Sequence, residues 1–157
     1  MTHPADDPLE LPDAIHAQVN VLAAAGDALA RQGKTGEAVA AYVKALGLVP
    51  EPLSNWSAAT WLLTAIGDAR FNAKQYEAAR LALQDAMHCP GAIGNPFIHM
   101  RLGQSQFELG NLTSAADELA RAYLLEGKAI FQEDDPKYLA FVTSKLDPPP
   151  GGWPDGW

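Results

Sequence analysis

Small and large apolar residues recur in a fixed order along the middle of the chain. Each of three glycines is followed twelve residues later by an alanine, then by a large apolar residue and a second alanine. The three series are Gly26, Ala38, Tyr42 and Ala45; Gly67, Ala79, Leu83 and Ala86; and Gly103, Ala115, Leu119 and Ala122. Intervals of three and four residues place side chains on one face of an α-helix. The pattern therefore predicts three pairs of helices that cross at small residues.

Glycine and proline mark the expected ends of these helices. Gly33 and Gly110 stand where the first helix of a pair should stop, because glycine readily adopts the left-handed backbone that ends a helix. Asn95 and Asp135 are each followed by proline, a combination typical of a helix N-terminus. The second of these opens a last helix, to about Lys145, which we expect to cover the exposed face of the last pair.

The series resembles the tetratricopeptide repeat, in which leucine-glycine, an aromatic residue, alanines and a closing proline recur about every 34 residues. The first unit carries the pattern most fully, with Leu22, Gly26, Leu29, Ala38, Tyr42, Ala45 and Pro50. The resemblance covers roughly residues 19–127. It implies an all-α fold of three helix-turn-helix pairs in a right-handed superhelix with a C-terminal capping helix.

The chain departs from the family pattern in two respects. The glycines are 41 and 36 residues apart, and the family's tryptophan position holds Leu22, Leu63 and His99. We place the repeats at about 19–52, 60–93 and 96–129, and the capping helix at about 135–146. The repeat domain then spans 11–146, after a loose acidic segment at 1–10 and before a tail at 147–157 rich in proline, glycine and tryptophan.

The chain of 157 residues carries a net charge of −8, which disfavours contact with nucleic acid. Either the charge attracts a partner with a basic surface, or it serves only to keep the protein in solution. The single cysteine excludes an internal disulfide. The chain also has no apolar run of about 18 residues and no basic, apolar start. We therefore expect no membrane span and a cytoplasmic location.

No arrangement of residues predicts catalysis. The four histidines are scattered, and the adjacent His88 and Cys89 cannot form a tetrahedral metal site by themselves. Glycine-rich phosphate loops and nucleophile motifs are missing from the sequence. We expect no enzyme activity, no cofactor and no metal, and a structural role for Cys89.

In the tetratricopeptide-repeat family, the first helices of successive pairs line a concave groove that usually holds the ligand. The resemblance, carried over residue by residue, gives three rows of partner-binding candidates. They are Asn20, Ala23, Asp27 and Arg31; Trp61, Thr64, Asp68, Phe71 and Asn72; and Phe97, Met100, Arg101, Gln104, Phe107 and Glu108. The large apolar members would form a strip with an acidic rim, as in protein interfaces. Alternatively some belong to the core, first of all Phe97 and Phe107, because the third pair must pack against the cap.

The chaperone-binding branch of the family grips a C-terminal carboxylate with lysine, arginine and asparagine. Here only Arg101 stands at a matching place, and Ala23, Asp27, Ala65 and Phe97 occupy the others. We therefore expect no carboxylate-terminated peptide as the ligand.

Residues 95–104, residues 135–138 and the Pro-Pro-Gly-Gly-Trp ending resemble small bacterial repeat proteins that accompany polymorphic toxins. This resemblance implies binding to a protein or peptide, as an adaptor or immunity protein for a toxin. An alternative is a chaperone of type III secretion, a group of similar length with three repeats and an acidic surface. A third hypothesis is an enzyme of unrecognised class. The sequence leaves the partner and the oligomeric state open.

Overall fold

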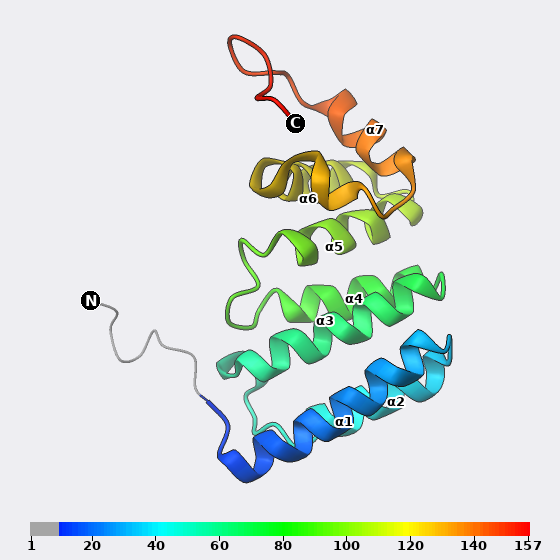
Figure 1. The fold of residues 1–157 in the computed structure, drawn as a ribbon, viewed down its shortest axis with the longest axis vertical. Coiled ribbons are helices and arrows are strands. Elements are labelled where there is room, and N and C mark those ends of the chain that lie inside the picture. Colours follow the sequence, from blue (N-terminus) through cyan, green and yellow to red (C-terminus); the bar gives the residue numbers. More distant parts are fainter. Residues whose placement is uncertain (1–9) are drawn as a thin grey trace, which may run out of the picture. The chain divides into compact units, whose positions relative to one another are not determined.

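The computed structural model describes residues 10–157, and these residues form seven α-helices, two short 3-10 helices and no β-strand (Figure 1). The all-α prediction is confirmed. The chain forms two compact units, Met1–Ile93 and Gly94–Trp157. The segment 1–10, predicted to be loose, lies outside the described residues except for Glu10.

The first unit contains two antiparallel helix pairs. Helix α1 (Asp13–Arg31) packs along α2 (Thr35–Leu46). A short 3-10 helix, η1 (Leu53–Asn55), then leads into α3 (Ser57–Asn72), which packs along α4 (Tyr76–Ala86). Helix α2 also contacts α3, so the two pairs share one apolar core.

The second unit contains the third pair and the cap. Helix α5 (Pro96–Glu108) packs along α6 (Leu112–Glu126), which continues into the 3-10 helix η2 (Gly127–Phe131). Helix α7 (Pro136–Lys145) then packs back on α6, and residues 146–157 follow without further helix. Asn95 and Asp135 cap α5 and α7 through side-chain oxygens that accept backbone N–H groups, which confirms the predicted helix starts.

The two helices of each pair approach closely because a glycine faces a large side chain. A Cβ added to Gly26 would lie 2.6 Å from Cε1 of Tyr42, and one added to Gly67 would lie 2.5 Å from Cγ of Leu83. The alanines of the three series are fully buried beside these contacts. The predicted crossing at small residues is thus confirmed, and glycine is the residue that receives the large side chain.

The turn inside each pair has the same backbone in all three pairs. Gly33, Lys74 and Gly110 occupy equivalent positions with φ of 74°, 61° and 81°. In each turn the next residue donates its N–H to a carbonyl five residues back, as from Gln75 to Arg70 (2.9 Å). This is the hydrogen-bond pattern of a Schellman helix end, which places one residue in the left-handed region. Lys74 therefore adopts a conformation that favours glycine.

Replacing Lys74 with glycine should stabilise the protein by about 0.5–1 kcal/mol, because a side chain in the left-handed region carries a steric cost that glycine avoids. Urea unfolding followed by circular dichroism measures the change. Lys34→Gly provides the control, since Lys34 has a negative φ of −87° and should gain nothing. Equal or lower stability of the Lys74 variant would contradict the expected strain.

His99 occupies the tryptophan position of the family pattern and is 2% exposed. Its Nε2 accepts the N–H of Gly94 at 3.1 Å, so Nδ1 carries the ring proton and donates to Oε2 of Glu118 at 2.6 Å. A buried imidazole with both nitrogens bonded incurs no unsatisfied polar group. This pairing joins the start of α5 to α6 in place of an indole ring.

The C-terminal tail folds back onto the second unit. Trp153 and Trp157 both pack edge-on against Tyr123, with ring centroids 5.4 and 5.5 Å away, and Tyr123 is 2% exposed. Gly127 makes room for this packing, because a Cβ there would lie 3.2 Å from Cδ2 of Trp157. The tail therefore covers part of α6 and η2 together with the capping helix α7.

Candidate functional site

The first two rows of partner-binding candidates lie in the first unit, on α1 and α3. Spacings of three and four residues place each row along one side of its helix. Asn20, Asp27, Arg31, Trp61 and Asn72 are exposed, whereas Thr64, Asp68 and Phe71 are half-buried and Ala23 is buried. The Thr64 hydroxyl donates to the Thr60 carbonyl, and Phe71 packs edge-on against Tyr76 of α4 (5.5 Å).

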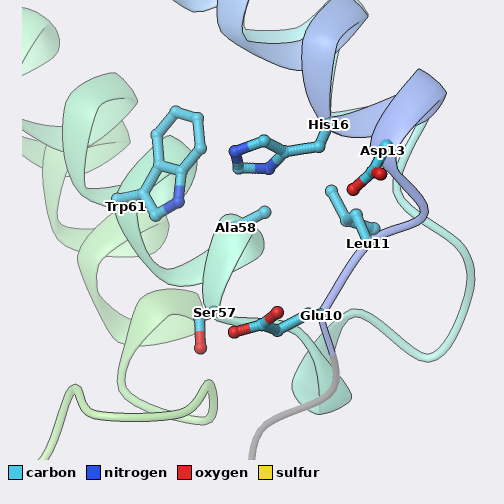
Figure 2. Close-up of a pocket in the computed structure, with 7 residues that line it drawn as sticks. All are labelled: Glu10, Leu11, Asp13, His16, Ser57, Ala58 and Trp61. Carbon is cyan, nitrogen blue, oxygen red and sulfur yellow. The ribbon is translucent and has the colours of Figure 1, made fainter.

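A pocket of about 360 Å³ opens beside Trp61, between the start of α1 and the start of α3 (Figure 2). We call it the Trp61 pocket. It is lined by Glu10, Leu11, Asp13, His16, Ser57, Ala58 and Trp61. Trp61 is 38% exposed, and the His16 ring points toward its indole, while the Glu10 carboxylate is turned toward Ser57 (Figure 2). The pocket thus combines an aromatic wall with two carboxylates.

A second pocket, of about 330 Å³, lies further along the same two helices, and we call it the Asp27 pocket. It is lined by Asp27, Ala30, Gly33, Thr35, Tyr42, Ala65, Asp68, Ala69, Asn72 and Ala73. The Tyr42 hydroxyl donates to Oδ1 of Asp27 at 2.6 Å. Burial, this hydrogen bond and the nearby Asp68 carboxylate raise the pKa of Tyr42 above its ordinary value. Tyr42 therefore stays neutral and holds Asp27 in place.

Each pocket is lined by two acidic side chains. Glu10 and Asp13 line the first, Asp27 and Asp68 line the second, and neither lining contains lysine or arginine. Arg31, one turn beyond Asp27 on α1, is the nearby counter-charge and acts on the same Tyr42 hydroxyl. This side of the first unit is thus suited to a ligand that carries positive charge.

The third row lies on α5 in the second unit, and the structure buries most of it. Met100 is 3% exposed, Arg101 is 8% exposed and Gln104 is fully buried. The residues from Ile98 to Gln106 are all buried, so α5 has no open face along most of its length. The predicted apolar strip therefore lacks Met100, whereas Phe97 and Phe107, expected to be the first residues buried, are half-buried.

Arg101 takes part in a polar cluster rather than in an open clamp. Its Nη1 donates to Oε1 of Gln104 at 2.8 Å and to Oδ1 of Asp134 at 3.2 Å, and Nε2 of Gln104 donates to Oδ2 of Asp134 at 3.1 Å. The guanidinium also lies over the Phe97 ring, 5.2 Å from its centroid. These contacts hold the segment before α7 against α5. The Arg101 guanidinium thus binds side chains of its own unit.

Phe107 and Glu108 bind the cap. Phe107 packs edge-on against Tyr138 and Phe141 of α7, and Glu108 accepts hydrogen bonds from the Tyr138 hydroxyl (2.6 Å) and the Lys137 ammonium (2.6 Å). Burial by itself would raise the pKa of Glu108, but these two donors outweigh it and hold the pKa below its ordinary value. The contact therefore stabilises the fold above the ordinary carboxyl pKa and is lost as the pH falls through the lowered pKa.

Side chains that could together hold a metal ion are not gathered in the described part of the chain. Within residues 10–157, no three or more side chains of histidine, cysteine, aspartate and glutamate lie together as a metal site would require. Burial, followed by the Asp85 carboxylate, raises the pKa of the Cys89 thiol, which lies near the carbonyls of Leu53 and Asp85. A thiol with a raised pKa is a poor nucleophile, in keeping with a structural role.

Residues 19–52, which form the body of α1 and α2, match the family model described as the tetratricopeptide repeat. Solved tetratricopeptide-repeat structures superpose on most of the chain. The chain therefore has a tetratricopeptide-repeat fold. The Arabidopsis OM64 domain matches with a TM-score of 0.67 at 16% identity, covering 84% of this chain and 99% of that domain. The first such domain of human RPAP3 gives 0.64 at 23% identity, covering 82% and 94%.

A third tetratricopeptide-repeat structure is the first repeat domain of Spaghetti (RPAP3) bound to the HSP90 peptide SRMEEVD. It matches with a TM-score of 0.62 at 21% identity, covering 82% of this chain and 92% of that domain. No curated protein sequence matches the chain. None of the helices between residues 10 and 157 has the length and apolar character that a membrane span needs.

The sequence did not predict that Glu10, Asp13 and His16 would line the Trp61 pocket. Glu10, Asp13 and His16 precede the first repeat, which the pattern places at residue 19, and α1 begins six residues earlier, at Asp13. The available signal was Pro12 followed by an acidic residue, which is common at the start of a helix. Extending the first helix by this signal would have brought Asp13 and His16 into the candidate row.

Proposed function

We propose that the protein binds an extended segment of a partner protein along the exposed sides of α1 and α3. The observation that carries this proposal is Trp61, which is 38% exposed at the wall of a pocket, whereas the other aromatic side chains among residues 10–157 are buried or half-buried. Partly exposed aromatic side chains beside a pocket are typical anchors of protein interfaces. Tetratricopeptide-repeat domains of the same fold bind peptides, as the Spaghetti complex illustrates.

A basic partner suits this surface better than an acidic one. Glu10, Asp13, Asp27 and Asp68 line the two pockets, and the single residue that matches the carboxylate clamp, Arg101, is bound to Asp134. The SRMEEVD peptide of the Spaghetti complex carries three acidic side chains and would meet like charges here. The partner segment in our proposal therefore carries lysine or arginine.

The biological role that we propose is an adaptor or immunity protein for a bacterial toxin, acting in the cytoplasm. Support comes from the resemblance of residues 95–104, residues 135–138 and the tryptophan-containing tail to toxin-associated repeat proteins. A chaperone of type III secretion is the alternative, and two pockets on one side of the molecule suit its extended effector segment equally well. Co-expression with toxin domains and with secreted effectors encoded nearby separates the two roles. Formation of a stable complex identifies the partner class.

Trp61→Ala should weaken the complex with such a partner about tenfold or more, mainly through faster dissociation, because buried aromatic anchors supply much of the interface energy. Asp68→Asn should chiefly slow association, and its effect should shrink in high salt. Surface plasmon resonance with the co-expressed partner measures both rates.

Val43→Ala is the matched control for Trp61, since Val43 is 52% exposed on α2 and lines neither pocket. Circular dichroism verifies that each variant is folded. If Trp61→Ala bound the partner as the parent does, the interface would lie elsewhere and the proposed site would be abandoned.

A further inference from the structure

The Trp61 pocket has the components that recognise a single positive side chain. An exposed indole attracts an ammonium or guanidinium group over its face, and nearby carboxylates add charge and hydrogen-bond acceptors. Here the indole of Trp61 forms one wall, and Asp13 and Glu10 lie on the other sides of the same space (Figure 2). The volume of about 360 Å³ leaves room for the end of an arginine or lysine side chain.

The Asp27 pocket is also suited to a positive side chain, although its lining contains no indole. Its lining includes four alanines and one glycine, and these small residues leave a volume of about 330 Å³ for the end of a long side chain. Asp27 and Asp68 face this space from the two helices, and Tyr42 fixes the Asp27 carboxylate through its hydroxyl. Arg31, which also acts on the Tyr42 hydroxyl, opposes a second cation in part, and the Asp27 and Asp68 carboxylates together supply the negative charge of the pocket.

The distance between the pockets sets the spacing of the two side chains in the partner. Along α3 the lining residues shift from Ser57, Ala58 and Trp61 to Ala65, Asp68, Ala69, Asn72 and Ala73. At a rise of about 1.5 Å per residue this shift corresponds to roughly 16 Å, and the shift along α1 corresponds to roughly 20 Å. An extended chain advances about 3.3 Å per residue, so about six residues span the interval. Residues six apart also point to the same side of an extended strand and of a polyproline helix.

From this geometry we infer that the two pockets bind a pair of basic residues about six positions apart in one extended partner segment. The first basic side chain stacks on Trp61 between Glu10 and Asp13, and the second enters the Asp27 pocket beside Asp68. This inference rests on the proposed function and adds to it the chemical class of the ligand and its spacing.

The test uses the full-length protein and fluorescein-labelled peptides in which two arginines are embedded in an uncharged glycine-serine sequence. The separation of the arginines is increased one residue at a time, and affinity is measured by fluorescence anisotropy at physiological ionic strength. We expect the tightest binding at a separation of about six, and a loss of about tenfold when either arginine is replaced by citrulline, which keeps the shape without the charge.

Variants of the protein assign each arginine to its pocket. Trp61→Leu and Asp13→Asn should remove the contribution of one arginine, and Asp68→Asn that of the other. Asp117→Asn is the matched control, because Asp117 is an exposed acidic residue on α6 that pairs with Arg121 and lines neither pocket. It changes the net charge as Asp13→Asn does and should leave the affinity unchanged.

Affinity that rises with the number of arginines but not with a particular separation would overturn the inference, as would an equal loss in the Asp117 variant. Absence of binding by every such peptide would overturn it as well. These outcomes leave the proposed function intact as long as Trp61→Ala still weakens the complex with the co-expressed partner. If Trp61→Ala has no effect on that complex, the proposed function itself fails.

Discussion

Asp134→Ala should lower the free energy of unfolding by about 3 kcal/mol, because it leaves the guanidinium of Arg101 buried without its carboxylate. The Arg101 and Asp134 side chains are only 10% and 18% exposed, so water replaces the lost partner poorly. Gln104, which is fully buried, loses the acceptor of its side-chain amide in the same variant. Urea unfolding followed by circular dichroism measures the loss.

Two further variants separate this effect from a general effect of charge. Asp117→Ala breaks an exposed ion pair with Arg121, whose side chains are 54% and 63% exposed, and should cost about 0.5 kcal/mol or less. The triple variant Arg101→Met, Gln104→Leu and Asp134→Leu should recover much of the stability, since apolar residues of similar volume can replace a buried ion pair and no buried amide is then left without a partner. If Asp134→Ala cost no more than Asp117→Ala, the cluster would not hold the capping segment in place.

Gly103→Ala should destabilise the protein by about 2–3 kcal/mol, through overpacking between α5 and α6. A Cβ at this position would lie 2.7 Å from Cγ of Leu119 and 3.0 Å from its backbone nitrogen. The side chain of Leu119 can rotate, but its backbone can move away only if α6 shifts. The same contact at Gly67 meets side-chain atoms of Leu83, so Gly67→Ala should cost less than Gly103→Ala.

Gly36→Ala is the control for this prediction. Gly36 lies in the first turn of α2, and none of the other segments within residues 10–157 lies within 4 Å of a Cβ added there. Alanine favours the helix over glycine by about 0.5–1 kcal/mol, so this variant should be slightly more stable than the parent. Thermal unfolding of the three glycine variants gives the order. Equal stability of the Gly103 variant and the parent would mean that the two helices are not held at the distance described.

The two sets of variants bear on function as well as on stability. The Gly103 and Asp134 substitutions lie in the second unit, whereas both pockets are formed by the first. Mild destabilisation of the second unit should therefore leave the peptide affinity unchanged at temperatures where the protein stays folded. Substitutions of Trp61 and Asp68 should show the opposite pattern, with a change of affinity at nearly unchanged stability.

The sequence by itself determined the helix pairs and their contacts. Gly26, Gly67 and Gly103 precede their large partners by sixteen residues, and this local repeat is enough to predict which helices pair and where they cross. Caps and turns are local too, since Asn95 and Asp135 bind backbone groups two or three residues away. Short-range periodicity therefore predicted the fold, because each helix pair is a contiguous stretch of the chain.

Only the tertiary structure decided which of α1, α3 and α5, the first helices of the three pairs, keep a side exposed to solvent. Helical spacing shows which side of α5 faces α6, but not that Asp134, thirty residues after Gln104, covers another side. The burial of Met100 and Gln104, and the folding back of Trp153 and Trp157 onto Tyr123, depend on such distant contacts. The Trp61 pocket likewise joins residues before the first repeat to the start of α3. Periodicity predicts which side of a helix packs against its neighbour in the sequence. Segments far away in sequence decide whether the other sides are also buried. Those distant contacts therefore decide which side chains remain available to a partner.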